Sequence, residues 1–170
     1  IFNYTNCKNP ERDNLILILL LNTGMRVGEL ASLNLSNINL QEKTINVIGK
    51  GNKERIIYIN EYCKNRIKNY LTLRKESLKP FLVTKRGKRL TVNRIESICK
   101  KAFKLMDLEE YNYTTHSLRH TAATIIYKSC NDILITKEFL GHSSIVSTQI
   151  YTHINNRELK RAMDRHPLNC

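Results

Sequence analysis

A run of seven apolar residues, LILILLL at 15–21, is the feature that most limits how this chain can fold. It is far shorter than the roughly 20 residues that a membrane-spanning helix needs. Charged residues before it and the lack of a small-residue cleavage site argue against a secretion signal. Pro10 followed by Glu11 suits the start of a helix, so we expect a helix through about Asn22 that ends near Gly24.

The size and charge of the chain limit its architecture and its partners. At 170 residues, 41% of them hydrophobic, it can bury the core of one domain, whereas a second full domain would be a squeeze. Lys and Arg number 28 against 15 Asp and Glu, which gives a formal net charge of +13 and a pI of about 9.7. This surplus favours a polyanionic partner, with nucleic acid as the first candidate. A solvated basic surface without a partner is the alternative.

The five cysteines are scattered along the chain and odd in number. No C-x-x-C or Cys/His pair has a spacing typical of zinc ligands, so we expect neither a metal site nor a disulfide framework. The sequence also shows no cluster of carboxylates suited to two metal ions. We therefore expect a cytoplasmic protein with reduced thiols, namely Cys7, Cys63, Cys99, Cys130 and Cys170.

The remaining pattern predicts a mainly α fold with a small antiparallel β-sheet (α+β). Two stretches rich in β-branched side chains, 44–48 (TINVI) and 55–59 (RIIYI), flank the turn-forming GKGNK and predict a hairpin. A short strand is expected at 81–83, before the basic turn KRGKR. Helices are expected at 27–35, 61–75, 91–106, 115–130 and 132–140, with shorter helical pieces at 145–151 and 156–165.

The stretch TGMRVGEL, residues 23–30, places an arginine where an anion is favoured. Arg26 lies just after Gly24, at the expected start of a helix, where free backbone N–H groups and the helix dipole attract negative charge. Its guanidinium adds a fork of donors that matches two phosphate oxygens. Glu29, one turn later, could hold that fork in place. The alternative is an ordinary surface salt bridge between the two side chains.

Basic side chains also gather in two turns. Lys50 lies at the hairpin tip with a glycine on each side, which gives it freedom to reach into a groove, and Lys53 and Arg55 make the same loop strongly basic. Glycines that serve only the turn geometry are the alternative. We expect both turns to contact DNA, through Lys53, Arg55, Lys85, Arg86, Lys88 and Arg89.

The segment TTHSLRHTAAT, residues 114–124, opens an expected core helix with two histidines and an arginine. His116 and Arg119 are three residues apart and so share one helix face. Thr114 or Thr115 can cap the helix and leave its N–H groups aimed at a ligand. A packed role is expected for His120, whose neighbours are apolar.

The segment LGHSSIVSTQIYTH, residues 140–153, combines a histidine with a tyrosine. Gly141 should end a helix, His142 follows it, and Tyr151 comes nine residues later. A tyrosine hydroxyl has a pKa near 10, so it acts as a nucleophile only where nearby cations favour its oxyanion. A packed tyrosine with its hydroxyl at the surface is the alternative.

Together these four motifs, in this order and at these separations, resemble the tyrosine recombinase (phage integrase) family, and most closely its Xer-like and transposon integrases. The resemblance covers nearly the whole chain and implies the catalytic-domain fold of that family. It implies that Glu29 supports Arg26 without itself being one of the active-site residues. It also implies six active-site residues, namely Arg26, Lys50, His116, Arg119, His142 and Tyr151.

The resemblance further implies a site-specific recombinase or integrase that cleaves and rejoins DNA strands through a 3′-phosphotyrosyl intermediate. No cofactor, metal or ATP is implied, because the phosphotyrosine keeps the bond energy. A DNA-binding regulator that does not cut is the alternative from another class. Relaxation of supercoils, as by type IB topoisomerases, is the alternative among enzymes.

The same resemblance guides the expected organisation. Residues 1–170 correspond to the catalytic domain alone, without the family's N-terminal core-binding domain. The expected partners are double-stranded DNA and further copies of the chain, in a tetramer on DNA formed through the segment 156–165; docking of that segment on its own domain is the alternative. No membrane is expected. The Asn-, Ile- and Lys-rich composition indicates an AT-rich bacterial genome, hence a cytoplasmic, nucleoid-associated protein.

Overall fold

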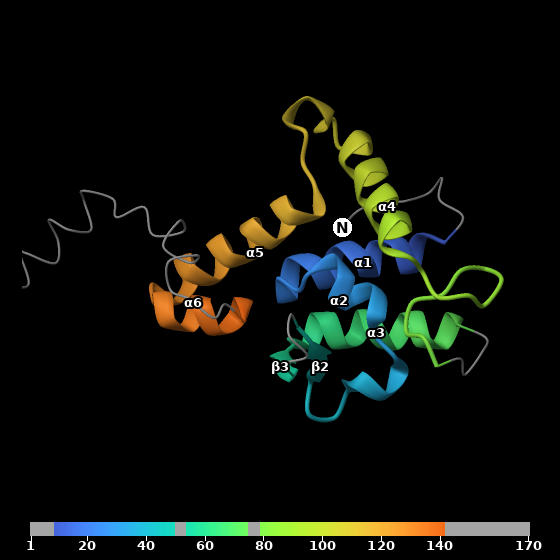
Figure 1. Cartoon of the computed structure of the whole chain (residues 1–170), viewed down its shortest axis with the longest axis horizontal. Helices are drawn as coiled ribbons and strands as arrows, with labels where there is room; N and C mark the ends of the chain where they lie inside the picture. Colours follow the sequence, from blue (N-terminus) through green and yellow to red (C-terminus); the bar gives the residue numbers. More distant parts are fainter. Residues whose placement is uncertain (1–8, 50–53, 75–78, 142–170) are drawn as a thin grey trace, which may run out of the picture.

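The computed structural model describes residues 9–49, 54–74 and 79–141, and the fold is mainly helical with one small sheet (Figure 1). Its α-helices within these ranges are α1 (Pro10–Thr23), α2 (Val27–Ser32), α3 (Glu61–Leu73), α4 (Val92–Leu105), α5 (Thr115–Cys130) and α6 (Ile133–Leu140). The strands are β1 (Ile38–Asn39), β2 (Thr44–Ile48) and β3 (Glu54–Tyr58), and short 3-10 helices cover Leu35–Asn37 and Glu109–Tyr111. The predicted fold class is therefore confirmed.

Helix α1 forms the centre of the core. Every residue from 12 to 20 is buried, as expected for a helix that is apolar almost all round. Helices α3, α4 and α5 all contact it. It ends where Gly24 adopts the left-handed conformation, with φ of +58°, and donates its N–H to Leu20 O at 3.0 Å. This end of α1 brings the TGMRVGEL motif to the surface beside α5.

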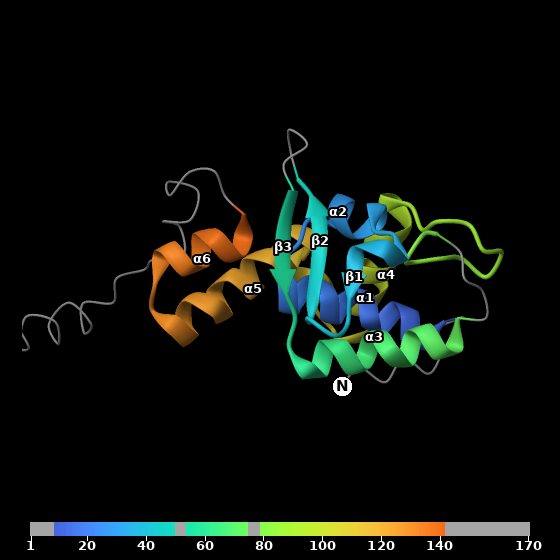
Figure 2. The same ribbon diagram turned by 90° about the horizontal axis from the view of Figure 1, so that it is seen from below.

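The sheet is antiparallel in the order β1-β2-β3, and Figure 2 shows the three strands side by side. Ile45 pairs with Ile57, and Val47 pairs with Arg55. Ile45, Val47 and Ile57 are buried, so this face of the hairpin packs on the core. Because side chains alternate along a strand, Arg55 lies on the same inward face.

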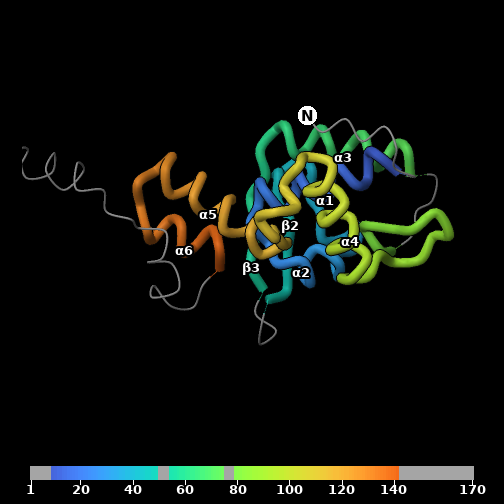
Figure 3. Tube along the Cα trace, turned by 90° about the horizontal axis from the view of Figure 1, so that it is seen from above, coloured from blue at the N-terminus to red at the C-terminus, as the bar shows by residue number. Residues whose placement is uncertain are grey.

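Helices α5 and α6 extend from one end of the body, as all three ribbon and tube views show (Figures 1, 2 and 3). Helix α5 packs on α1, and its buried Leu118 belongs to the main hydrophobic core. Helix α6 then folds back along α5. Its last residues return to α1, since a Cβ added to Gly24 would lie 2.9 Å from the ring of Phe139. The end of α6 thus reaches the end of α1.

Several boundaries differ from the sequence prediction. Helix α2 stops at Ser32 rather than at residue 35, because a 3-10 turn at Leu35–Asn37 leads into the unpredicted strand β1. Residues 81–83 form no strand; instead isolated bridges join Asn34 to Pro80 and Val83 to Arg89. The helical pieces predicted at 145–151 and 156–165 lie outside the described residues. No described helix is long and apolar enough to cross a membrane.

Two cysteines belong to the core. Cys63 and Cys99 are buried and unpaired, and burial raises the pKa of each thiol to about 12. Both thiols therefore stay protonated near neutral pH, as structural cysteines do. Cys130 is exposed at the end of α5 and is also free, whereas Cys7 and Cys170 lie outside the described residues.

Candidate active site

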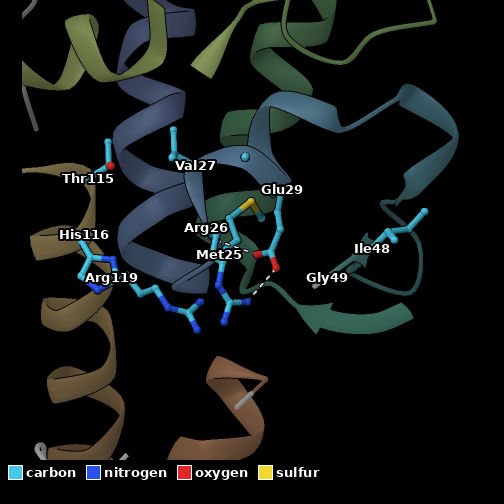
Figure 4. A pocket seen from close by; sticks show the side chains of 10 residues that line it. Met25, Arg26, Val27, Glu29, Ile48, Gly49, Thr115, His116 and Arg119 are labelled. Carbon is cyan, nitrogen blue, oxygen red and sulfur yellow. Dashed lines mark hydrogen bonds and ion pairs between the residues drawn. The ribbon is translucent and has the colours of Figure 1, made fainter. Parts of the chain in front are cut away.

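A pocket of about 440 Å³ lies where the start of α2, the start of α5 and the end of β2 meet (Figure 4). It brings together residues that are distant in the sequence. Three of the six predicted active-site residues line it, together with the predicted supporting carboxylate. The lining residues are Met25, Arg26, Val27, Gly28, Glu29, Ile48, Gly49, Thr115, His116 and Arg119.

Arg26 immediately precedes α2, and its backbone explains how it is held there. Its N–H donates to Oε2 of Glu29 at 2.7 Å, which is the usual return bond of a helix start. Its Nη1 donates to Oε1 of the same carboxylate at 3.2 Å. The Arg26 side chain is nevertheless 44% exposed, and Figure 4 shows its guanidinium beside that of Arg119. The backbone of Arg26 is thus fixed by Glu29, while its guanidinium faces the pocket.

Glu29 is buried and holds two arginines at once. Arg55 donates Nη1 to Oε1 at 2.6 Å and Nη2 to Oε2 at 2.9 Å, which is a two-pronged pair between β3 and α2. Burial alone raises the pKa of Glu29. The hydrogen bonds from Arg55 and from the Arg26 N–H, together with both positive charges, outweigh burial and lower this pKa below 4.5. Glu29 is therefore an anion at neutral pH.

Arg119 is buried at the meeting point of two helix ends. Its Nη1 donates to Gly24 O and its Nη2 donates to Leu140 O, the latter at 2.7 Å. Both acceptors lie at helix C-termini, α1 and α6, where carbonyl groups concentrate negative charge. One guanidinium therefore joins α1, α5 and α6 and also lines the pocket.

His116 lies at the mouth of the pocket on the first turn of α5. Thr114 caps this helix, as predicted, and accepts the N–H of His116 at 3.2 Å. The ring of His116 is exposed and meets the ring of His120 edge-on, with centroids 5.0 Å apart. Burial lowers the pKa of His120, and the charges of His116 and Arg119 lower it further. His116 is thus the more accessible imidazole.

The remaining predicted residues fall into two groups. Lys50, Lys53, His142 and Tyr151 lie outside the described residues. The basic turn at 85–89 is far from the pocket, at the end of the body opposite α6 (Figure 2). There the predicted DNA contacts Lys85, Arg86 and Lys88 are exposed.

Two arginines predicted to contact DNA also make hydrogen bonds inside the protein. Arg55 belongs to β3 rather than to the hairpin loop, and its side chain is only 17% exposed. Arg89 donates to Ala31 O and Leu33 O at 3.0 and 2.9 Å, and so ties the basic turn to the end of α2. The two-residue period of β3 places Arg55 on one strand face with Ile57, but the apolar Ile56 and Tyr58 on the other face hide this signal in the sequence. No local signal reveals Arg89, because its acceptors lie far away in the sequence.

The pocket combines two guanidiniums and an imidazole, and Glu29 is the one carboxylate among the described residues that line it. Such a donor set suits a tetrahedral anion whose charge grows during a reaction. Among the described residues, no cluster of three or more His, Cys, Asp or Glu side chains could hold a metal ion.

Comparison with known proteins agrees with this geometry. Residues 1–158 match the profile of the phage integrase family. The tyrosine recombinase XerC of Caldanaerobacter subterraneus subsp. tengcongensis is 45% identical over 163 residues, which cover 93% of this chain and 46% of that protein. The crystal structure of XerA recombinase superposes with a TM-score of 0.77 at 35% identity, over 92% of this chain and 57% of the other.

A further solved structure, the XerH site-specific recombinase bound to its difH substrate in a pre-cleavage complex, has a TM-score of 0.79 at 27% identity. The match covers 94% of this chain and 48% of that one. The chain thus spans about half the length of the relatives that it matches. On the family profile and on the XerC relative, this chain belongs to the phage integrase family.

Proposed function

We propose that residues 1–170 are the catalytic domain of a site-specific DNA recombinase or integrase, and that a separate core-binding domain completes the enzyme. The observation that carries this proposal is the pocket, in which Arg26 from the start of α2 meets His116 and Arg119 from the start of α5, two parts of the chain that are far apart in the sequence. Relatives named as recombinases support the same reaction. The formal net charge of +13 suits DNA as the substrate.

In the proposed reaction the Tyr151 hydroxyl attacks the scissile phosphate of one DNA strand. A bond forms between the tyrosine oxygen and phosphorus, and the bond from phosphorus to the 5′ oxygen breaks. His116 accepts the tyrosine proton, while Lys50 protonates the departing 5′ oxygen. The 5′ hydroxyl of a partner strand then reverses these steps and releases the tyrosine. Bonds formed and broken balance, so no external energy source is needed.

Arg26 and Arg119 stabilise the charge that builds on the non-bridging oxygens as phosphorus becomes five-coordinate, and His142 donates a further hydrogen bond to them. Loss of one such preorganised donor commonly costs about 3 kcal/mol, or roughly a hundredfold in rate. Two contacts support this arrangement from the described residues. Gly49, which lines the pocket, directly precedes Lys50, and Leu140, which binds Arg119, lies two residues before His142.

We also propose that the protein assembles as a tetramer on DNA through the segment 156–165. The segment carries a narrow apolar stripe of Leu159, Ala162 and Met163. Apolar side chains that could receive such a stripe, Ile125 and Leu134, are more than half exposed on α5 and α6. Sedimentation of the protein–DNA complex tests this: loss of residues 156–170 should abolish the tetramer, and a tetramer that persists would contradict it.

The reaction is tested with the natural full-length protein and the genomic DNA of its source, nicked at random, in the presence of EDTA. A nick beside the cleavage position lets the short cleaved end diffuse away and traps the covalent intermediate. We expect an adduct that resists SDS and whose attached DNA ends map to one sequence. The recovered sequence then supplies a defined nicked duplex for rate measurements.

The matched variant is Tyr151→Phe, which should bind the recovered duplex but form no adduct. An adduct that persists in this variant would show that Tyr151 is not the nucleophile. DNA binding without any adduct in the unaltered protein would overturn the proposal in favour of the regulator that does not cut.

A further inference from the structure

Arg55 lies behind the pocket, is not among the residues that line it, and has a side chain that is mostly buried. It is the second residue of β3 and lies opposite Val47, on the face of the hairpin that packs on the core. Its stem passes close to the end of α6, since a Cβ on Gly141 would lie only 2.6 Å from its Cδ. Its guanidinium then makes both of its bonds to Glu29. Arg55 therefore links the hairpin, α2 and the end of α6.

The carboxylate of Glu29 is saturated by this arrangement. Two oxygens offer about four lone-pair directions. Oε1 accepts Nη1 of Arg55 at 2.6 Å and Nη1 of Arg26 at 3.2 Å. Oε2 accepts Nη2 of Arg55 at 2.9 Å and the backbone N–H of Arg26 at 2.7 Å. The Arg26 side chain is left with one long bond to a carboxylate that would otherwise take two.

We propose that Arg55 is a positioning residue that keeps the guanidinium of Arg26 available to the scissile phosphate by occupying both oxygens of Glu29. The inference rests on the proposed function, in which Arg26 binds that phosphate. Arg55 touches no substrate atom; it acts only through Glu29.

The physical reason is competition for one guanidinium. Arginine and a carboxylate favour a two-pronged pair, and the Glu29 side chain is only 5% exposed, so water scarcely compensates a lost partner. Without Arg55, Glu29 would draw the fork of Arg26 towards itself and away from the pocket. The single long bond seen here is therefore a consequence of the second arginine. The negative charge of Glu29 anchors Arg26 in the presence of Arg55, but without Arg55 it would hold the Arg26 guanidinium away from the phosphate.

The test measures single-turnover adduct formation by the full-length protein on the nicked duplex at saturating DNA, beside the dissociation constant for that DNA. Arg55→Met keeps most of the stem but removes every donor. We expect its rate to fall about tenfold to a hundredfold, as small misplacements of a reacting group do. The dissociation constant should stay unchanged, because the Arg55 guanidinium is bound to Glu29 and its side chain is only 17% exposed. The matched control is Arg66→Met, which removes a half-buried pair with Glu11 between α3 and α1, and should leave the rate unchanged.

A double variant separates positioning from a merely structural role. In Arg55→Met with Glu29→Gln, the neutral amide no longer competes for Arg26, so the rate should recover towards that of the unaltered protein. A structural role predicts the opposite, since each change would add its own loss. If Arg55→Met unfolds, Arg55→Lys replaces it. The single ammonium group of a lysine cannot bind both carboxylate oxygens of Glu29 as Arg55 does. We therefore expect Arg55→Lys to form the adduct more slowly than the unaltered protein.

The outcomes distinguish this inference from the function on which it rests. Absence of adduct in the unaltered protein overturns both. Adduct formation in the unaltered protein with the same rate in Arg55→Met, or in Arg55→Lys where that variant is used, overturns the inference alone. A double variant slower than Arg55→Met also overturns it. A slow single variant and a recovered double variant establish it.

Discussion

Single residues behind the pocket are constrained by the side chains packed against them, and Gly141 at the end of α6 is the sharpest case. Its φ of +62° is unfavourable for any residue with a Cβ, and an added Cβ would lie 2.6 Å from Cδ of Arg55. We therefore expect Gly141→Ala to lower the free energy of unfolding by about 1–2 kcal/mol, measured by urea denaturation. Gly28→Ala is the control, because nothing lies within 4 Å of the added Cβ. Equal effects of the two changes would contradict this account.

The charge on Glu29 leads to a pH-dependent prediction. The folded protein lowers the pKa of this carboxyl below 4.5, so its stabilising contribution is complete above pH 4.5 and is lost as the pH falls through the folded value. Glu29→Gln leaves Arg55 buried without its anion, and we expect a loss of about 3 kcal/mol at neutral pH. Urea denaturation of both proteins as a function of pH checks this. The difference should narrow only below pH 4.5, and a constant difference there would contradict it.

At the scale of elements, α6 depends on its first turn because it is only eight residues long. Asp132 caps it by accepting the N–H groups of Leu134 at 2.7 Å and Ile135 at 3.1 Å. Asp132→Ala should cost about 1 kcal/mol and speed hydrogen exchange at these two amides. Glu138→Ala, which removes the same charge from the same helix without a cap, is the control. Equal exchange in both variants would show that the cap does not hold α6.

Elements were predictable wherever their signals are local. Pro10, Thr114 and Asp132 are residue types that favour helix starts. In the structure α1 begins at Pro10, and Thr114 and Asp132 are the N-caps of α5 and α6. The two-residue strand β1 could not be predicted, because it exists only through its pairing with β2. The same holds at Val83, which is fixed by a bridge to Arg89 and not by any strand propensity. Contacts between distant residues leave little trace in a short stretch of sequence.

The candidate site likewise contains residues that local sequence signals predict and residues whose place depends on contacts distant in the sequence. Arg26 and His116 could be predicted because each lies at a recognisable helix start, and the resemblance linked those starts. The second partner of Glu29 could not, since the basic loop suggested a surface role for Arg55. Arg55 binds Glu29 because it lies on the inward face of the hairpin, together with Ile57. The sequence does not show this clearly, because the two residues on the outward face are also apolar, so polar and apolar residues do not alternate along the strand. Ile56 and Tyr58 are in fact exposed.

At the scale of the whole molecule, where the positive charges lie should matter more for DNA binding than the net charge of +13. The basic turn with Lys85 and Lys88 is exposed at one end of the body, whereas α3 lies on the side opposite α2 (Figures 2 and 3). Changing Lys85 and Lys88 to Gln, or Lys64 and Lys68 of α3 to Gln, lowers the formal net charge equally. Only the first pair is expected to contact phosphates.

Binding to a random-sequence duplex over a range of salt concentrations separates the two cases. Each lost phosphate contact lowers the slope of log K against log salt by about 0.9, so the Lys85 and Lys88 variant should lose about 1.8. The α3 variant should keep the original slope, because charges farther from the DNA than a Debye length of about 10 Å are largely screened. Equal changes in both variants would mean that the total charge governs binding. An unchanged slope in the Lys85 and Lys88 variant would exclude the basic turn from the DNA interface and confine binding to the surface around the pocket.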